Sequence, residues 1–405
     1  MKKFLTFAIV VSLLTGFAAC SEIPEDLFGD STGQTDGDDN NDPTDDPKDD
    51  EDKPLITQEN MEAAFPDPKF RTYVLENFDT NEDGEISEKE AAAVDIISVD
   101  YKGIASLEGV QYFANLNELR CSANKLTSLD VSKNTALEVL NCRLNQLTSL
   151  DVSKNTALEV LECYINQLTT LDVSNNTELT YLDCYGNQLT VLDVSKNIAL
   201  TYLQCMENLL TALDVSKNTA LTELACSYNP FTTLDVSKNT ELITLGCPHN
   251  QLTSLDVSNN TKLENLWCGY NQLTTLDVSK NTALISFSCQ DNQLTSLDIS
   301  NNTKLEDLWC SDNQLTSLDV SKNTALTIYL DCYNNQLTTL DVSNNTKLQS
   351  LVCFGNQLTT LDVSKNTELT SLDCTENPLE KLYIKAGINF NTLSYPEQTE
   401  IIYVN

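Results

Sequence analysis

The oxygen-bearing side chains of residues 79–90 have the spacing that a calcium ion requires. Asp79, Asn81 and Asp83 occupy the first, third and fifth places of the segment DTNEDGEISEKE, and Gly84 follows at the sixth. Calcium takes six to eight oxygen ligands, and glycine at the sixth place allows the sharp turn that gathers them around one ion. The pattern draws its other ligands from the backbone carbonyl of Glu85, the hydroxyl of Ser87 and both carboxylate oxygens of Glu90.

Residues that begin helices flank this segment on both sides. Asp67 and Pro68 are typical of a helix start before it, and Ser87 with Glu90 predicts a capping box for a helix after it. The arrangement matches an EF-hand, with Ala91 where a larger apolar residue is usual and with no second hand to pair with. We predict one Ca²⁺ site, with Asp79, Asn81, Asp83, Glu85, Ser87 and Glu90 as ligands. The alternative is an acidic surface turn of little affinity.

A cysteine that recurs every 21 residues defines the main part of the chain. Disulfide frameworks and zinc sites use clustered, uneven spacings, whereas a fixed period of this length is typical of a solenoid of stacked coils. The column has thirteen members and one longer interval of 22 residues. Its members are Cys121, Cys142, Cys163, Cys184, Cys205, Cys226, Cys247, Cys268, Cys289, Cys310, Cys332, Cys353 and Cys374.

The repeat unit LxxLxCxxNxLTxLDVSxNTx indicates which side chains face the core of the solenoid. Alternation along a short strand puts Leu140 and Cys142 on one face, where each cysteine replaces a core leucine as a small apolar residue. Burial should keep these thiols protonated and unreactive, and occasional disulfides between adjacent coils are left open. Asn145 lies where the chain leaves the strand, and we expect its amide to bond the backbone of adjacent coils.

An aspartate also recurs, in twelve coils from Asp130 and Asp151 through to Asp362. Coils stack about 4.8 Å apart, so a ladder of metal-binding carboxylates is one interpretation. The favoured interpretation is that each Asp bonds the backbone of its own turn, while nearby Lys133 and Lys154 weaken the repulsion between the carboxylates.

Four positions per coil, on either side of the inward Leu and Cys, vary freely between repeats and should face outward on the concave side of the sheet. Between Cys121 and Cys374 these positions hold eleven of the thirteen aromatic residues. They are Tyr164, Tyr181, Tyr185, Tyr202, Tyr228, Trp267, Tyr270, Trp309, Tyr329, Tyr333 and Phe354. Exposed Tyr and Trp are enriched at interfaces, so we predict that these side chains bind a partner. The alternative is that aromatic residues simply suit strands. The carboxylates that lie among them favour a partner with some positive charge; they are Glu162, Asp183, Asp307, Asp312 and Asp331.

The first twenty residues are typical of a bacterial lipoprotein signal peptide. Two lysines precede an apolar run, and small residues lead to Cys20, which we predict to be lipidated. Cleavage nearby and release as a secreted protein is the alternative. We expect residues 1–20 to be this signal peptide, 21–55 a disordered acidic tether, 56–115 a helical cap with the EF-hand-like loop, 116–380 the thirteen repeats and 381–405 a C-terminal cap.

Composition and residue types exclude several classes of function. A formal net charge of −36 argues against binding to nucleic acid or to bare anionic lipid, because phosphates would be repelled. His249 is the only histidine, so a Ser–His or Cys–His pair could be built only there. Acidic pairs should lie on an open surface, which does not raise pKa values as a desolvated cleft does. We therefore expect no enzyme activity and no catalytic cofactor.

The motif LxxLxCxxNxLTxLDVSxNT, together with the lead-in IASLEGVQYFANLNEL, resembles the bacterial internalin-like leucine-rich repeat proteins. Within that family it is similar to the internalin J type, whose 21-residue repeats place a Cys in the strand. The resemblance covers residues from about 65 to the C-terminus. It implies a curved, right-handed leucine-rich repeat solenoid with a parallel β-sheet on its concave face, behind a small α-helical N-terminal cap. The family pattern also has a wall-sorting motif and an immunoglobulin-like module after the repeats; neither is found in this sequence, which puts an invasion role in doubt.

The sequence thus leads to a hypothesis of binding. We expect a monomeric cell-surface adhesin, lipid-anchored to the bacterial outer membrane or cell surface, that recognises a protein of a host or a neighbouring cell. The alternative is a glycan-binding lipoprotein that uses the Tyr and Trp rings as a stacking platform. Contact with the membrane should occur only through the lipid anchor.

Overall fold

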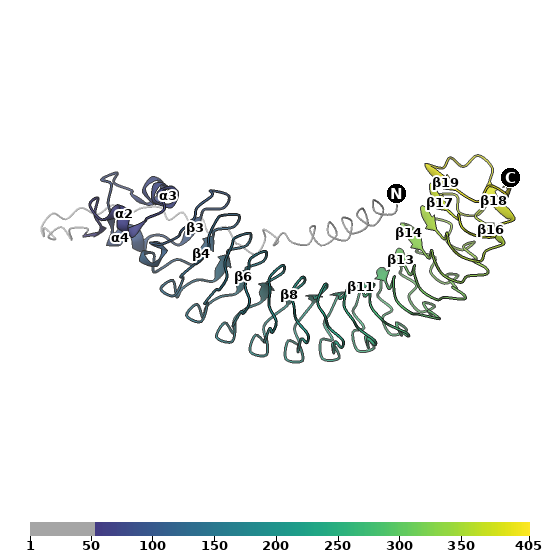
Figure 1. The fold of residues 1–405 in the computed structure, drawn as a ribbon, viewed down its shortest axis with the longest axis horizontal. Helices are drawn as coiled ribbons and strands as arrows, with labels where there is room; N and C mark the ends of the chain where they lie inside the picture. Colours follow the sequence, from purple (N-terminus) through teal and green to yellow (C-terminus); the bar gives the residue numbers. More distant parts are fainter. Residues whose placement is uncertain (1–52) are drawn as a thin grey trace, which may run out of the picture. The chain divides into compact units, whose positions relative to one another are not determined.

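The computed structural model describes residues 53–405, which form one curved solenoid. Fifteen strands make a continuous parallel sheet that lines the inner side of the arc (Figure 1). This confirms the prediction of a leucine-rich repeat solenoid with a parallel sheet on its concave face. The predicted signal peptide, Cys20 and the tether up to residue 52 lie outside the described residues.

The strands of the large sheet follow one another in space in the order of the sequence, apart from β16 and β18, which belong to another sheet. They are β3 (Ile96–Ser98), β4 (Glu118–Arg120), β5 (Val139–Asn141), β6 (Val160–Glu162), β7 (Tyr181–Asp183), β8 (Tyr202–Gln204), β9 (Glu223–Ala225), β10 (Thr244–Gly246), β11 (Asn265–Trp267), β12 (Ser286–Ser288), β13 (Asp307–Trp309), β14 (Tyr329–Asp331), β15 (Ser350–Val352), β17 (Ser371–Asp373) and β19 (Thr392–Ser394).

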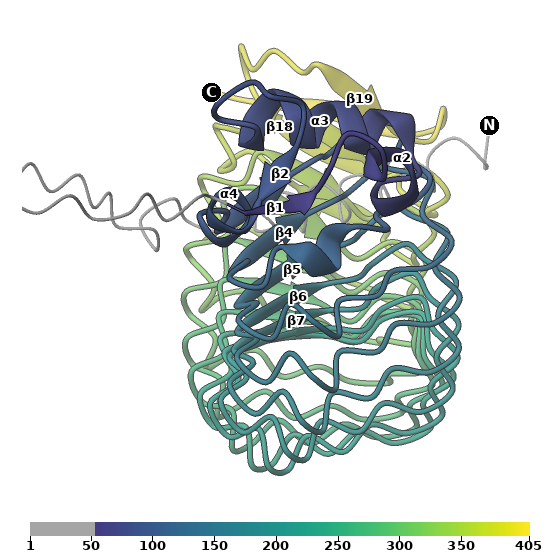
Figure 2. The same cartoon turned by 90° about the vertical axis from the view of Figure 1, so that its left-hand side faces the viewer.

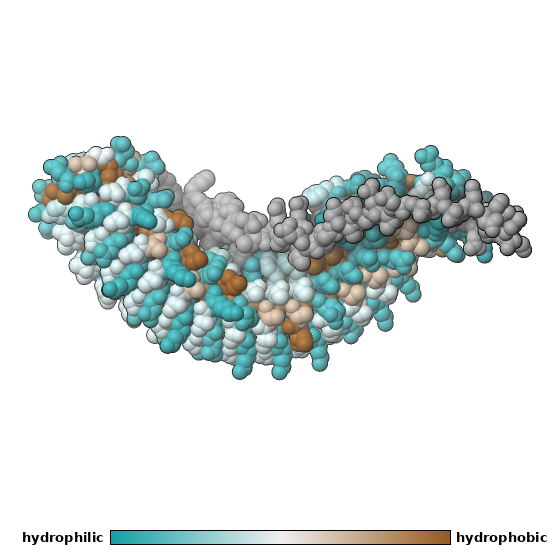
Figure 3. Space-filling view, turned by 180° about the vertical axis from the view of Figure 1, so that it is seen from behind, coloured by the Kyte–Doolittle hydropathy of each residue, from teal (hydrophilic) through white to brown (hydrophobic). Residues whose placement is uncertain are grey.

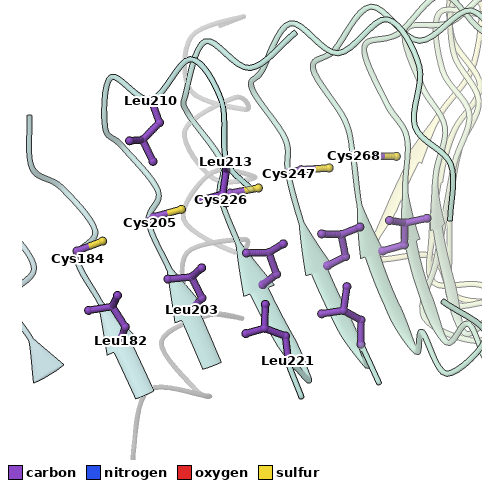
Figure 4. Packing of buried hydrophobic residues seen from close by; sticks show 14 of the residues in the cluster. Leu182, Cys184, Leu203, Cys205, Leu210, Leu213, Leu221, Cys226, Cys247 and Cys268 are labelled. Carbon is purple, nitrogen blue, oxygen red and sulfur yellow. The ribbon is translucent and has the colours of Figure 1, made fainter. Parts of the chain in front are cut away.

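Each of the coils contributes its central strand leucine and the following cysteine to one continuous core. Leu182 and Cys184 are fully buried, as are their counterparts in the other coils, and the labelled sulfur atoms lie in a row (Figure 4). All thirteen cysteines of residues 53–405 are free thiols. Burial raises the pKa of Cys142 to about 12, so the thiols are protonated, as the sequence predicts.

The asparagine that ends each strand segment joins consecutive coils through its amide. Asn271 donates from Nδ2 to the carbonyl oxygens of Cys247 and Cys268, both at 3.0 Å, and its Oδ1 accepts from the Leu252 amide at 3.0 Å. The same contacts recur along the solenoid, as for Asn145. The predicted amide column is confirmed, and it satisfies buried backbone groups that no strand partner reaches.

The outer turns carry the aspartate column and a second amide column. Asp151 Oδ1 accepts from the Ser153 amide at 2.9 Å, and the equivalent bond is present in all twelve coils that have the Asp. This bears out the turn interpretation. Asn155 is fully buried and donates to Val131 and Asn134 of the preceding coil at 2.9 and 2.7 Å. A short polar residue at this place also suits a local turn, so the sequence did not reveal this second column.

The 22-residue interval is absorbed immediately before β14. Thr327 and Ile328 both donate their amides to the Glu306 carbonyl, at 3.1 and 3.0 Å. Tyr329 then pairs with Asp307 in the regular register. The side chain of Ile328 is 53% exposed, so the extra residue leaves the core unchanged.

The N-terminal cap closes the first coil (Figure 2). It consists of β1 (Pro54–Ile56), α2 (Met61–Ala64), α3 (Pro68–Phe78), β2 (Ile86–Ser87), α4 (Glu88–Ala92) and the 3₁₀ helix η2 (Val110–Tyr112). Asp67 caps α3 by accepting from Lys69 and Phe70, and its other oxygen accepts from Ala105 at 2.7 Å, which ties the cap to the solenoid. Gly109 has a φ of 105°, and a Cβ there would lie 2.2 Å from the Phe65 ring, so only glycine fits.

The C-terminal end adds a second, three-stranded sheet, formed by β16 (Thr360–Asp362), β18 (Lys381–Lys385) and β20 (Glu400–Val404). β16 contains the last member of the aspartate column, Asp362, so this sheet covers the outer wall. Ile401, Ile402 and Val404 belong to β20, which closes this sheet beside β18. No helix within residues 53–405 has the length and apolar character needed to cross a membrane.

Candidate functional site

The concave face is built from the first and third residues of each strand and the two residues after the cysteine. We call these outward positions 1 to 4; in the coil of Cys184 they are Tyr181, Asp183, Tyr185 and Gly186. Because the strands pair in exact register, equivalent positions stack from coil to coil: Tyr181 pairs with Tyr202, and Asp183 with Gln204. All eleven aromatic residues predicted to bind a partner lie at these positions.

Position 4 has a left-handed backbone in all thirteen coils. The φ values of Tyr228, His249 and Tyr270 are 53°, 54° and 55°. Residues other than glycine adopt this conformation at a cost of about 1–2 kcal/mol, and the bonds of the adjacent asparagine hold it here. The repeated geometry directs successive position-4 side chains the same way.

The aromatic residues form separate groups rather than one continuous ladder. Tyr228, His249 and Tyr270 make a stack of three rings with centroids 4.1 Å apart. Tyr181 and Tyr202 stack at 4.1 Å. The remaining pairs are Tyr333 with Phe354 at 4.5 Å, Tyr164 with Tyr185 at 6.3 Å and Trp309 with Tyr329 at 5.9 Å. In the stacked groups the ring faces cover one another and the edges are left for solvent or a partner.

Several concave carboxylates are buried among these rings. Asp183 is 4% exposed, and burial raises its pKa to about 7, although its Oδ1 accepts from the Tyr185 amide at 3.0 Å. Burial likewise raises the pKa of Glu223 to about 7 and that of Asp307 to about 6. The expectation that an open surface leaves such groups unshifted is therefore wrong here, because large neighbouring side chains desolvate them.

One cation is already placed on an aromatic ring within this face. The Arg143 guanidinium lies 5.2 Å from the centroid of the Tyr164 ring and 3.7 Å from a carboxylate oxygen of Glu162. Glu162 is buried. The concave face thus contains one complete set of ring, carboxylate and cation.

The predicted calcium loop has much of the internal geometry that its sequence implies. Asp79 Oδ2 accepts from the Gly84 amide at 2.8 Å, and Gly84 has a φ of 79°. Asn81 and Asp83 lie close together, with Asn81 Nδ2 donating to Asp83 Oδ2 at 2.9 Å. β1 pairs antiparallel with β2, which lies within the loop.

Both carboxylate oxygens of Glu90 accept hydrogen bonds from Thr80 and Ser87. Its Oε1 accepts from the amide and hydroxyl of Thr80 at 2.7 and 2.8 Å, and its Oε2 from those of Ser87, both at 2.9 Å. Burial opposes ionisation of Glu90, but these hydrogen bonds outweigh it and lower its pKa to about 2. Within residues 53–405, no three His, Cys, Asp or Glu side chains converge as a metal-binding group. The calcium site stays a prediction that requires Glu90 to turn toward the ion.

Sequence reasoning missed two participants of the concave face. His249 lies between Tyr228 and Tyr270 in the three-ring stack, and burial lowers its pKa to about 4, so it is a neutral aromatic ring at neutral pH. Its repeat position, shared with both tyrosines, was the available signal. The sequence analysis also missed the contact between Arg143 and Tyr164. These residues occupy equivalent positions in adjacent coils, and this could have indicated the contact.

Internalins of Listeria monocytogenes are among the known proteins that this chain resembles. No protein-family model matches the chain. Over 71 residues the chain is 40% identical to internalin J of Listeria monocytogenes serotype 4b (strain F2365). That match spans 18% of this chain and only 8% of the length of internalin J.

Solved structures extend the similarity over most of the solenoid. The functional domain of InlJ from Listeria monocytogenes, described as including a cysteine ladder, superposes with a TM-score of 0.72 at 40% sequence identity, covering 80% of this chain and 76% of that chain. The internalin inlF from Listeria monocytogenes str. 4b F2365 gives a TM-score of 0.62 over 87% of this chain and 98% of that chain. Its 21% identity supports the fold alone.

Proposed function

Since the chain belongs to the internalin-like leucine-rich repeat proteins, we propose that it is an exported surface adhesin that recognises a protein partner through its concave face. The observation that carries this proposal is the concentration of aromatic side chains at the outward positions of the sheet. Half-buried rings held rigidly by a scaffold provide contact area at little entropic cost. Anchoring through Cys20 would place this face outside the cell.

The arrangement of the rings favours a protein over a glycan as the partner. Sugars stack on open ring faces, but the faces between Tyr181 and Tyr202 and within the Tyr228–His249–Tyr270 stack are covered by neighbouring rings. Their edges and the tyrosine hydroxyls suit the mixed polar and apolar surface of a folded protein or peptide. Glycan binding is the competing function, and its test is given below.

The first prediction concerns Tyr181 and Tyr202. The fluorescently labelled full chain is screened on paired arrays of surface proteins and glycans, and each ligand is then measured with the Tyr181→Ala/Tyr202→Ala variant. We expect a protein ligand whose affinity falls by about tenfold or more, because a tenfold loss corresponds to about 1.4 kcal/mol and the truncation of one aromatic hot spot costs about 2 kcal/mol or more.

A matched variant and a competing outcome complete this test. Tyr403→Ala removes a tyrosine that is 67% exposed on β20, away from the concave face, and should bind as the unmodified chain does. Equal affinities of all three chains for the protein ligand would refute the proposal. Retention on a polysaccharide that is lost in Trp267→Ala and Trp309→Ala would instead establish the glycan function.

We also propose that the loop at residues 79–90 binds one Ca²⁺ and thereby stiffens the cap. Asp79, Asn81 and Asp83 supply side-chain oxygens, Glu85 its carbonyl, Ser87 its hydroxyl and Glu90 both carboxylate oxygens after rotation away from Thr80. β1 is paired to this loop, so the ion would fasten the strand that follows residues 1–52.

The second prediction is therefore calcium-dependent stability. Calcium at a hundredfold excess over its Kd should stabilise the chain by about 2.7 kcal/mol, measured as a rise in unfolding temperature relative to chelator. Asp83→Asn keeps the acceptor for the Glu85 amide, which Asp83 Oδ1 accepts at 2.8 Å, but lowers the charge of the site and should reduce the shift. Asp130→Asn, on an outer turn, should leave the shift unchanged. An unfolding temperature that calcium does not alter would rule out the site.

A further inference from the structure

Four side chains on adjacent strands form an alternating square of rings and carboxylates. β13 and β14 pair in parallel, with Asp307 opposite Tyr329 and Trp309 opposite Asp331. All four residues occupy outward positions 1 and 2, so they share the concave face. The two rings lie diagonally, with centroids 5.9 Å apart and planes inclined by 37°. Unlike the stacked pairs, these inclined rings do not cover each other's faces. We call this set the aromatic–carboxylate square.

Both carboxylates of the square are buried without a cation. Asp307 is 7% exposed and Asp331 is 2% exposed. None of the four ion pairs found within residues 53–405 includes either of them. Buried carboxylates in proteins are usually paired with a cation, and desolvation raises the pKa of Asp331 well above its ordinary value. The square therefore holds two buried carboxyl groups whose charged forms a cation would stabilise, and it has no cation beside them.

The surrounding face supplies no cation either. From β6 to β17, outward positions 1 to 4 contain ten carboxylates and no Lys or Arg. The lysines of these coils, such as Lys304 and Lys322, lie outside these four positions. Hydrophilic residues recur at regular intervals along the outer curve of the arc (Figure 3). The positive charge of the repeats is thus separated from the concave face.

A complete version of the same combination exists nearer the N-terminus. There the Arg143 guanidinium rests over Tyr164 and beside the Glu162 carboxylate. A cation over an aromatic ring is stabilised by the ring quadrupole, and a carboxylate alongside adds a charge-assisted contact. At β13 and β14 the rings and carboxylates are present while the cation is missing from the face.

We propose that the aromatic–carboxylate square binds a lysine or arginine side chain of the partner, which presents it from an extended basic segment. This inference rests on the proposed protein-binding function and specifies the chemistry of the ligand. Trp309 and Tyr329 contact the cationic head and its alkyl stem, and Asp307 and Asp331 accept its hydrogen bonds. The carboxylates of neighbouring coils, such as Asp312 on the outward side, attract further basic residues of the same segment.

The test uses the full chain and a hexalysine peptide with blocked ends. The chain has two tryptophans, Trp267 and Trp309, and both lie on the concave face, so intrinsic fluorescence reports binding there. We expect a saturable change that weakens as salt is added, about tenfold weaker affinity in Asp307→Asn/Asp331→Asn, and no saturable change with fully side-chain-acetylated hexalysine. Asn can still accept a hydrogen bond from the Tyr333 amide, as Asp331 does. A cooperative thermal transition at or above the unfolding temperature of the parent confirms that the variant is folded.

The matched control removes the same charge from the outer turns. Asp298→Asn/Asp319→Asn neutralises two members of the aspartate column in neighbouring coils and should change affinity less than twofold. An equal loss in both double variants would mean unspecific attraction to a polyanion and would overturn the inference, as would equal binding of the acetylated peptide or no saturable change at all. Hexalysine could fail to bind while the Tyr181→Ala/Tyr202→Ala variant still loses affinity for a protein ligand. That result would overturn only this inference and would leave the proposed function standing.

Discussion

Asp183 shows that a carboxylate buried in the concave face lowers the stability of the folded chain when it is ionised. Its pKa of about 7 arises first from burial and then from the nearby Glu162 and Glu223, while the Tyr185 amide and Arg143 act in the opposite direction. An unfolded Asp titrates near 3.9. The folded chain therefore retains a proton that the unfolded chain releases between about pH 4 and 7, and stability falls as the pH rises through that window.

The third prediction follows from this fall in stability with rising pH. Asp183→Asn keeps an acceptor for the Tyr185 amide and removes the buried charge, so it should stabilise the chain at pH 8 by roughly 2–4 kcal/mol, and the difference should vanish near pH 4. Thermal unfolding across this pH range measures it.

Asp172→Asn is the matched comparison. Asp172 is exposed, and hydrogen bonds from Ser174 lower its pKa, so its contribution is present at neutral pH and is lost on acidification. The variant should be slightly less stable than the parent at pH 8. A destabilised Asp183→Asn at pH 8 would show that the buried carboxylate is a net source of stability.

Residue roles that depend only on position in the repeat were predictable. Leu140, Cys142 and Asn145 recur with one period, and alternation along the strand fixes their direction. The shifted pKa of Asp183 was not predictable in this way, because it depends on how tightly side chains from three neighbouring coils pack around one carboxylate. The hydrogen bonds of Asn155 to the preceding coil were not predictable either. An Asn at this place is equally expected for a local turn, so its residue type does not distinguish the two roles.

At the level of the elements, the coil before β14 shows that an insertion is tolerated where it meets only solvent. In an ordinary coil the residue before the strand and the first strand residue share one carbonyl, as Thr180 and Tyr181 share that of Glu159. In the long coil Thr327 and Ile328 take these two bonds. Tyr329 then begins the strand without a bond to Glu306.

The fourth prediction is that deleting Ile328 restores an ordinary coil. Tyr329 would take the second bond to the Glu306 carbonyl, and an exposed apolar side chain would be lost, so the unfolding temperature should stay the same or rise. Deleting Leu330, which is fully buried, should unfold the neighbouring coils. Circular dichroism melts of both variants measure the difference. A large loss of stability on deletion of Ile328 would mean that this extra residue itself supports β14.

The boundaries of the elements were less predictable than their repeat. β3 (Ile96–Ser98) already belongs to the large sheet, although the sequence places residues 56–115 in the cap. Its motif is degenerate because a terminal coil packs against helices on one side rather than against another coil. The outer sheet of β16, β18 and β20 likewise has no comparable strands in the ordinary repeats, where the outer wall of the described residues shows only an isolated bridge between Asp130 and Asp151.

For the whole molecule, stability should be distributed along the arc rather than shared equally. Each coil contacts only its neighbours, so opening is local and is easiest at the ends. The C-terminal coils close with β19 and β20, whereas the first coil is sealed by the aromatic cluster of Phe65, Phe70 and Phe113. We therefore expect the C-terminal end to open more often than the N-terminal end.

The fifth prediction uses the thiol column to measure this gradient. Every coil from Cys121 to Cys374 holds one buried, protonated thiol, which an alkylating reagent reaches only when that coil opens. Timed labelling of the native chain, read by peptide mass spectrometry, should modify Cys374 first and Cys247 among the last. A single common rate for all thirteen thiols would contradict local opening and indicate that the array unfolds as one unit.

The regular column of thiols provides one internal probe in each coil, so the position of a bound ligand along the solenoid can be determined. A ligand seated on the concave face suppresses the opening of the coils beneath it, so the thiols behind those coils should be protected while the others keep their rates. The footprint of an unknown partner can then be read from inside the molecule, at a spatial resolution of one coil, without placing a label on the surface that does the binding.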